Sequence, residues 1–389
     1  MTRRQALTAT VLALCAASAG WLVNDHAPPA AGGAGVTGPA AASSSAPHAA
    51  VTPPDTAAVP SAPASRADIG PADPTARWPV TPAPRPGTVE VCHLGTAPEG
   101  SEQAKALAAL AQQQAQQAGE ALYRLMLASP DAATRAAAQL ALDQKDELAA
   151  TARQTLDPTV YAFALQACGR GGTPPRTGHC SQLSTGQMAR LDAGNAVPWL
   201  AVAIQAEARG DQGGVAEALH RASLATTSLQ REVRLADLAL SAIPPDWPVP
   251  HAMHAATSVL QLQASLAVPS YLAAVRHCAA ERIHDSNVQQ TCSRLAQVLA
   301  DHGDSLVDFG IGIKLGARAG WPAASTARYA RLQQAYQQTQ TDADHQADKL
   351  PQATSCHALR AAAQTALAHA RVGERRYAEQ MRLRLGLAD

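Results

Sequence analysis

Hydrophobic and polar residues follow three different patterns along this chain of 389 residues. A run without charge extends over residues 6–23, directly after the two cations Arg3 and Arg4. Residues 25–87 have no hydrophobic period, whereas apolar residues recur at helical spacing from Ser101 onwards. The pattern therefore predicts a targeting or anchoring segment, a linker and a large helical body.

Capping residues mark the predicted helix boundaries in the body. Ser101 begins a helix that we expect to reach Ala128. The segments Ser129-Pro130-Asp131 and Asp157-Pro158 predict two further starts, with proline in the first turn. A glycine followed by an acidic residue ends one helix and starts the next, and this pair occurs at residues 210–211, 303–304 and 373–374. We therefore expect an all-α body of irregular αα-hairpins, arranged like a helical repeat.

The clearest predicted hairpin joins residues 196–209 to residues 215–222 through Gly210-Asp211. Its small alanines, placed where two helices cross closely, resemble a tetratricopeptide-like αα-hairpin over residues 196–225. That resemblance implies a scaffold, although no strict period of about 34 residues extends it along the chain. The whole chain also resembles exported, alanine-rich bacterial helical proteins, and this resemblance implies no activity.

Proline-rich stretches divide the chain. The predicted linker, residues 24–90, contains 14 of the 27 prolines between Pro28 and Pro86, so we expect a disordered tether without a packed core. Four prolines within residues 244–250 exclude a helix there. This second boundary predicts two helical subdomains, residues 91–243 and 251–389.

The N-terminal segment predicts export. Two cations before an apolar run place the following chain outside the cytoplasm, in the periplasm. Residues 17–19 fit a small-x-small cleavage site, which would release a soluble protein, while an uncleaved residue 6–23 segment would anchor it to the inner membrane. Two alternatives are a lipoprotein signal at Cys15 and a twin-arginine signal at Arg3-Arg4.

Composition restricts the class of protein further. The chain has 90 alanines and 3% aromatic residues, which argues against an all-β fold, nucleic-acid stacking modules and aromatic-lined clefts. Lys and Arg together number 31, as do Asp and Glu, so no global charge attracts a polyanion. We expect a partner that is another envelope protein, and no nucleic acid.

Six cysteines follow Cys15, and an even number in an exported chain predicts disulfides. Cys278 and Cys292 are equidistant from Asp285, so antiparallel helices would place them opposite each other. The remaining expected pairs are Cys168 with Cys180, across a loop rich in glycine and proline, and Cys92 with Cys356.

Metal or redox chemistry is the competing interpretation of these cysteines. Histidine adjoins four of them, at residues 92–93, 179–180, 277–278 and 356–357. Neighbours on a helix point about 100° apart, which makes such a pair a poor chelate. We therefore expect structural disulfides, with no metal ion and no cofactor.

Other candidate sites have simpler interpretations. His251 and His254 lie one helical turn apart, and we expect surface histidines rather than metal ligands. Gly312, Gly316 and Gly320 form a small-residue stripe that would let a second helix approach closely. A final helix over residues 371–385 carries five arginines, with Tyr377, Met381 and Leu385 on one line, and predicts a docked surface helix or a contact with anionic lipid.

No catalytic motif stands out in the sequence. We therefore predict a non-enzymatic, disulfide-stapled scaffold for protein–protein interaction in the periplasm. The alternative is a cell-envelope enzyme whose site is assembled from dispersed residues.

Overall fold

The computed structural model describes residues 73–78, 87–169, 177–348 and 355–384, without the side chains of residues 337 and 339–348. The chain divides into two units, Met1–Pro71 and Ala72–Asp389, and all described residues belong to the second unit. The predicted segment 6–23, Cys15 and most of the predicted linker lie outside the described residues. In the part of the chain that is described, no helix is both long and apolar enough to span a membrane.

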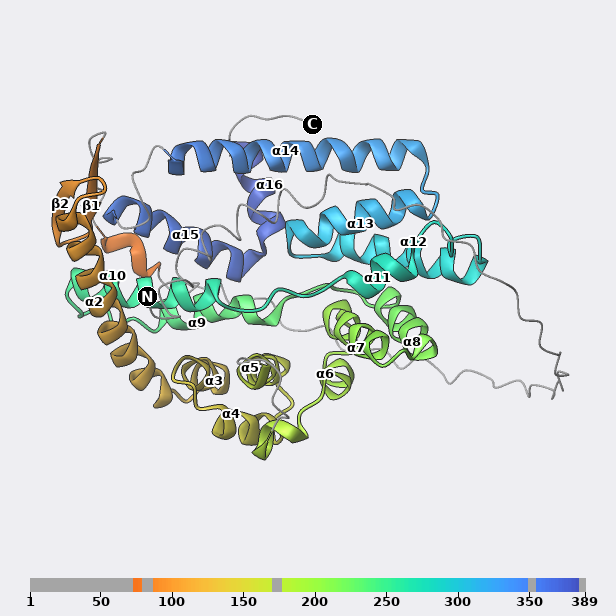
Figure 1. The fold of residues 1–389 in the computed structure, drawn as a ribbon, viewed down its shortest axis with the longest axis horizontal. Coiled ribbons are helices and arrows are strands. Elements are labelled where there is room, and N and C mark those ends of the chain that lie inside the picture. Colours follow the sequence, from red (N-terminus) through yellow and green to blue (C-terminus); the bar gives the residue numbers. More distant parts are fainter. Residues whose placement is uncertain (1–72, 79–86, 170–176, 349–354, 385–389) are drawn as a thin grey trace, which may run out of the picture. The chain divides into compact units, whose positions relative to one another are not determined.

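The prediction of an all-α body is confirmed, and Figure 1 shows its arrangement. The α-helices of the described residues are α2 (Glu102–Leu127), α3 (Ala132–Ala141), α4 (Lys145–Ala152), α5 (Pro158–Gly169), α6 (Thr185–Leu191), α7 (Ala196–Ala208), α8 (Gln212–Ser223), α9 (Arg234–Ser241), α10 (Val249–Ala264), α11 (Leu272–His277), α12 (Ser286–His302), α13 (Leu306–Arg318), α14 (Ala323–Asp348), α15 (Cys356–Val372) and α16 (Glu374–Arg384). Three short 3-10 helices accompany them, namely η1 (Pro74–Arg77), η2 (Gly178–Gln182) and η3 (Arg231–Val233).

Side-chain caps explain why several helices begin where the sequence predicts. Ser101 Oγ accepts a hydrogen bond from the Ala104 amide at 3.1 Å, so α2 begins at the next residue. The Asp131 carboxylate accepts from the Thr134 amide at 2.7 Å and caps α3, so Pro130 precedes the cap and is not in the first turn as predicted. Gly210 has a φ of 71°, a conformation that favours glycine, and separates α7 from α8. The predicted αα-hairpin at residues 196–225 is therefore present as α7 and α8.

The glycine–acid pair at residues 303–304 does not work as predicted. Gly303 has a φ of −72°, which is not left-handed, and the cap of α13 is Ser305 rather than Asp304. The Asp304 amide instead donates to the Ser228 carbonyl at 3.1 Å, which pairs this segment with a distant loop. A backbone hydrogen bond to a distant loop therefore takes the place of the local turn predicted at residues 303–304.

The last helix begins at Glu374 and not at Arg371, because Gly373 adopts a φ of 85° and ends α15. Its buried residues are Ala378 and Arg382, one position beyond the predicted line of Tyr377 and Met381. The helix docks through this neighbouring face.

The folded unit begins before the predicted end of the linker at residue 90. Asp73 caps η1, and Trp78 is only 2% exposed, with its carbonyl accepting from Arg360 at 2.5 Å. Strands β1 (Thr88–Val91) and β2 (Gly95–Pro98) then form an antiparallel hairpin with Val89 opposite Ala97. The proline-rich composition hid these anchors, because a few buried side chains suffice to fix them.

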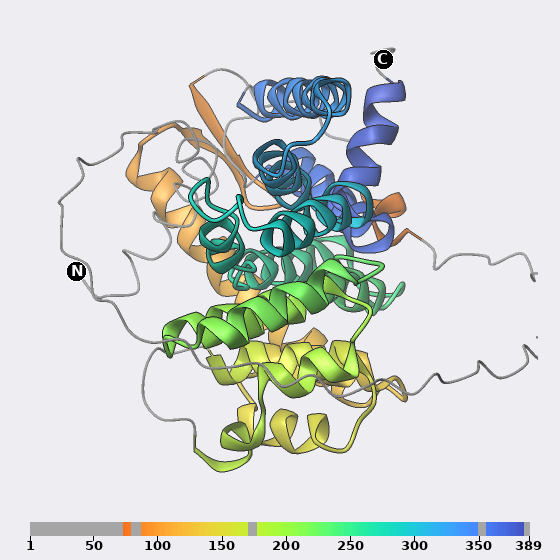
Figure 2. The same cartoon turned by 90° about the vertical axis from the view of Figure 1, so that its right-hand side faces the viewer.

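Buried residues form a main core and two smaller clusters. The main core combines residues of α2, α3, α4, α5, α9, α10 and α15. A second cluster combines residues of α7, α8, α11, α12 and α13, and a third joins α13, α14 and α16. Figures 1 and 2 show α2 beside α10, with the β1–β2 hairpin at the start of α2. The main core therefore draws on both predicted subdomains, residues 91–243 and 251–389.

Candidate functional site

A polar groove of about 580 Å³ lies along α12 and reaches the end of α13. Its lining consists of hydrogen-bonding side chains and one alanine, namely Ser286, Asn287, Gln289, Gln290, Ser293, Arg294 and Ala319. Because a helix repeats every 3.6 residues, the α12 residues form two parallel rows of three. We call this set of seven residues the α12 groove.

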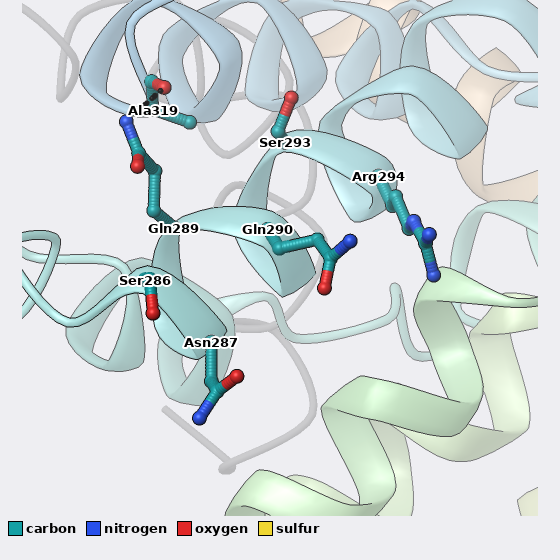
Figure 3. Close-up of a pocket in the computed structure, with 7 residues that line it drawn as sticks. All are labelled: Ser286, Asn287, Gln289, Gln290, Ser293, Arg294 and Ala319. Atoms are coloured by element: carbon teal, nitrogen blue, oxygen red, sulfur yellow. Dashed lines mark hydrogen bonds between the residues drawn. The ribbon is translucent and has the colours of Figure 1, made fainter.

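The two rows of the α12 groove have different roles. In the inner row, the Gln289 amide donates to the Ala319 carbonyl at 3.2 Å, and Ser293 Oγ accepts from the Trp321 indole at 3.0 Å. Figure 3 shows Gln289 and Ser293 directed toward α13, whereas Gln290 and Arg294 point away from it. The inner row therefore holds α12 against the end of α13, and the outer row presents its donors to solvent.

Arg294 gives the α12 groove its chemical character. It is the one charged residue of the lining, it is exposed, and no carboxylate lines the groove. A guanidinium pairs with carboxylates in a bidentate fashion, and the amides beside it both donate and accept. The groove suits a polar polypeptide segment that carries an acidic group.

A second polar region is buried beneath the start of α13. Asp308 is 0% exposed, and its carboxylate accepts hydrogen bonds from the Tyr271 hydroxyl and, at 3.2 Å, from Ser228 Oγ. Ser305 caps α13 by accepting from the Asp308 amide at 3.0 Å. Asp304 lies beside it, and its Oδ1 is buried without a hydrogen-bond partner. We call Ser228, Tyr271, Asp304 and Asp308 the acid cluster.

Burial controls the protonation of the acid cluster. Loss of hydration raises the pKa of Asp304 to about 7, and the nearby carboxylates of Asp308 and Glu374 add to this rise. Burial likewise raises the pKa of Asp308 to about 6, although the Tyr271 and Ser228 hydrogen bonds oppose the change. Burial and the neighbouring Asp308 raise the pKa of Tyr271, which therefore keeps its proton as a donor.

The structure joins the six described cysteines in the three pairs expected from the sequence. Cys278 at the end of α11 bonds to Cys292 in α12, with their Cα atoms 5.8 Å apart. Cys168 bonds to Cys180 at 5.5 Å between Cα atoms, and Cys92 to Cys356 at 4.6 Å. The last bond spans 264 residues and attaches the β1–β2 hairpin to the first residue of α15.

The cysteine–histidine neighbours have different surroundings. His277 is buried at the end of α11. His179 belongs to η2 and lies near the Arg153 side chain. The pair Cys92-His93 lies in the turn between β1 and β2, where His93 has a φ of 62°. The argument that such neighbours diverge on a helix therefore does not apply to Cys92 and His93.

The turn at His93 is part of a group that we call the sulfur cluster: Cys92, His93, Met253 and Cys356. The metal-ligating atoms of both cysteines and His93 lie within 4.8 Å of one another. Met253 Sδ lies 3.3 Å from His93 Nε2 and 3.8 Å from Cys92 Sγ. The two cysteines and Met253 are buried, while His93 is exposed.

His254 is not a surface histidine, contrary to the sequence prediction. It is 8% exposed, because it lies on the inner side of α10. Desolvation lowers the pKa of His254, and the neighbouring His93 and His251 lower it further. His251 is half-buried, with its ring 4.3 Å from that of Trp247. No signal in the sequence connected this helix to His93.

The three glycines of the predicted stripe have three different roles. A Cβ atom on Gly312 would lie 2.7 Å from the Ala300 amide nitrogen, so this glycine lets α13 approach α12. Gly316 makes room for the Trp321 ring instead of a helix. Gly320 has a φ of 81° and terminates α13. Close helix packing therefore depends on Gly312.

Comparison with protein-family models, with curated proteins and with solved structures finds no match to this chain. Function must therefore be argued from the α12 groove, the acid cluster and the sulfur cluster.

Proposed function

We propose that this protein is an exported, disulfide-stapled helical scaffold that binds another envelope protein through the α12 groove. The observation that carries the proposal is the outer row of Asn287, Gln290 and Arg294. These side chains are exposed and offer amide groups and one guanidinium without a carboxylate. The occupant is a polypeptide segment with an acidic group facing Arg294, because that geometry gives charge-assisted hydrogen bonds.

Two further features support a scaffold. The inner row is bonded to the segment at the end of α13, so the stretch of α12 backbone that carries the outer row is held in place before a partner arrives. Preorganisation of this kind lowers the entropy lost on binding. The α7–α8 hairpin, which resembles a tetratricopeptide-like hairpin, belongs to the same buried cluster as α12.

The periplasm is the proposed compartment. Three disulfides connect six cysteines of the described residues, and such bonds persist in oxidising compartments. The charge-free run over residues 6–23 after Arg3 and Arg4 provides the export signal. The mature protein is either released by cleavage or held at the inner membrane by that run. The mass of the native protein distinguishes the two forms.

Site-directed photocrosslinking in intact cells tests the scaffold. A photoreactive residue at Gln290 should yield one dominant protein adduct. The same residue at Gln103, an exposed glutamine of α2, should not. Arg294→Glu should abolish the Gln290 adduct, whereas Arg209→Glu, a charge reversal at an exposed arginine beyond α7, should leave it unchanged. Recovery of the same adducts at Gln103 and Gln290 would refute the α12 groove as the binding site.

The alternative function is a cell-envelope enzyme, and the acid cluster is the observation that favours it. Carboxylic acids with a pKa raised toward 7 serve as general acids and bases. However, neither Asp304 nor Asp308 lines the α12 groove. If the chain is an enzyme acting through these groups, Asp308→Asn should abolish its activity without altering the crosslink at Gln290.

A further inference from the structure

The sulfur cluster contains four potential metal ligands from three distant segments. Cys92 and His93 come from the turn after β1, Met253 from α10 and Cys356 from the start of α15. Their donor types are two thiols in the reduced state, one imidazole and one thioether. Monovalent copper, zinc and iron–sulfur clusters all take thiolate ligands, but zinc sites use cysteine, histidine and carboxylate ligands rather than a thioether, so Met253 favours copper(I).

The separations of Met253 from two other donors match those between the ligands of a four-coordinate metal. Metal bonds of about 2.0 to 2.3 Å place tetrahedral ligand atoms about 3.3 to 3.8 Å apart. Met253 Sδ lies 3.3 Å from His93 Nε2 and 3.8 Å from Cys92 Sγ, and these two separations fall at the ends of this interval. The atoms of Cys92, His93 and Cys356 also converge within 4.8 Å. The four donors therefore gather at one place, and reduction must first separate the two cysteine sulfurs, which are bonded to each other in this structure.

The backbone of His93 provides an independent observation. A φ of 62° is costly for a residue with a side chain, by about 1 to 2 kcal/mol. Glycine adopts this conformation more easily, and histidine is, with asparagine and aspartate, among the other residues that adopt it most often; here the histidine Nε2 lies against a buried thioether. A thioether is only a weak hydrogen-bond acceptor, so this contact gains little for the folded protein. The conformation forms part of the tight turn between β1 and β2, which the Leu94 amide closes by donating to the Val91 carbonyl at 2.8 Å, and the same turn places the imidazole against Met253.

We propose that the sulfur cluster is a redox-gated site for monovalent copper, formed when the Cys92–Cys356 disulfide is reduced. A dithiol reductant donates two electrons and two protons, which breaks the sulfur–sulfur bond, yields two thiols and leaves the reductant as a disulfide. One copper(I) ion then binds both cysteine sulfurs, with loss of their two thiol protons, together with His93 Nε2 and Met253 Sδ. The oxidised protein keeps only the imidazole and the thioether as donors, so it binds copper weakly.

Copper competition on the full mature chain tests this proposal. The protein is reduced anaerobically with a phosphine, which takes oxygen from water and becomes the phosphine oxide. The phosphine, which is itself a copper(I) ligand, is then removed anaerobically, and the protein is titrated with copper(I) against a chromophoric copper(I) chelator. In a chain whose other paired cysteines, Cys168, Cys180, Cys278 and Cys292, are replaced by serine, we expect one tight copper(I) ion that requires Cys92 and Cys356, and retention of the helical circular-dichroism signal. Loss of that signal without recovery on copper addition would overturn the proposal.

Matched variants separate the site from thiols elsewhere in the reduced chain. Met253→Leu should weaken copper binding at least about tenfold, whereas Met188→Leu, at a buried methionine of α6, should not. Cys278→Ser with Cys292→Ser should leave the affinity unchanged. Equal copper affinity in the wild type and Met253→Leu would show binding by thiolates alone and would refute the site.

His93→Asn distinguishes a ligand from a structural residue. Asparagine tolerates the left-handed conformation, so the oxidised variant should unfold at the same temperature as the wild type or higher. Its copper(I) affinity after reduction should nevertheless fall at least about tenfold. A variant with lowered thermal stability and unchanged copper affinity would assign His93 a structural role only.

Discussion

The sulfur cluster and the acid cluster both connect distant segments of the chain, but they respond to different conditions. In the sulfur cluster a covalent bond joins the β1–β2 hairpin to α15, and only a reductant releases it. In the acid cluster, Tyr271 and Ser228 donate to the carboxyl of Asp308, whose charge depends on pH. Two long-range connections of this alanine-rich body therefore depend on solution conditions: the sulfur cluster on the redox state and the acid cluster on the pH.

The largest expected effect comes from removing the long-range disulfide. In the chain-entropy model, a loop of 264 residues is worth about 5 kcal/mol of unfolding free energy, and a loop of 14 residues about 3 kcal/mol. The double variant Cys92→Ser/Cys356→Ser should therefore lose more stability than Cys278→Ser/Cys292→Ser. Denaturant unfolding without reductant measures both. A smaller loss for the Cys92 pair would show that local packing already fixes the hairpin.

The second largest expected loss of unfolding free energy comes from disturbing the close packing of α13, the helix that carries Asp308. A Cβ on Gly312 meets backbone atoms of α12, including the Ala296 carbonyl at 2.8 Å, which cannot rotate away. Gly312→Ala should therefore cost about 1 to 3 kcal/mol of unfolding free energy. Gly310→Ala is the matched control, since its nearest contact is the Gln333 side chain at 3.6 Å, and it should be neutral or stabilising. Equal thermal midpoints for the two variants would contradict the assigned role of Gly312.

Within the acid cluster, Asp308→Ala should cost about 2 kcal/mol, because it leaves the buried hydroxyls of Tyr271 and Ser228 without their acceptor. Tyr271→Phe removes one donor and keeps the ring, so its cost should be smaller. Urea unfolding of both variants at pH 7 compares them. If Tyr271→Phe were the more damaging change, the tyrosine hydroxyl and not the carboxyl of Asp308 would be the central element.

The sequence predicts the parts of this fold that depend on local chemistry. The caps at Ser101 and Asp131, the α7–α8 hairpin and the three cysteine pairs follow from residue type and spacing. The glycine–acid pair at residues 303–304 fails, because Asp304 pairs with Ser228 from a loop that lies 76 residues earlier in the chain. Patterns of neighbouring residues cannot reveal a partner that is so distant in the sequence.

The candidate sites were harder to predict than the helices for the same reason. The sulfur cluster needs His93 and Met253, which are separated by 160 residues, to meet in space. The acid cluster needs Tyr271 and Asp308, whose side chains show no pairing signal in the sequence. For the α12 groove, the sequence contains only a weak signal, the polar stretch of residues 286–294, and this stretch resembles an ordinary solvated helix face. Each site is defined by tertiary contacts.

The smallest predicted effect is a pH dependence that belongs to the acid cluster. Both Asp304 and Asp308 have a folded-state pKa raised above 3.8, so between about pH 4 and pH 7 the folded state binds more protons than the unfolded state. Their contribution to the unfolding free energy is fully present below pH 3.8 and is lost as the pH rises through the range of 6 to 7. Each unit of pKa difference corresponds to about 1.4 kcal/mol.

The wild-type profile also contains histidines with the opposite sign. Burial lowers the pKa of His254, His277 and His369, so their contribution is lost as the pH falls. The prediction therefore concerns the difference between the wild type and Asp304→Asn/Asp308→Asn, which keeps those histidines and removes the two carboxyls. From pH 6 to pH 8, the unfolding free energy of the wild type should fall relative to that of the variant by on the order of 1 to 2 kcal/mol. Chemical denaturation at four pH values measures it, and parallel profiles would mean that the buried carboxyls do not take up protons on folding.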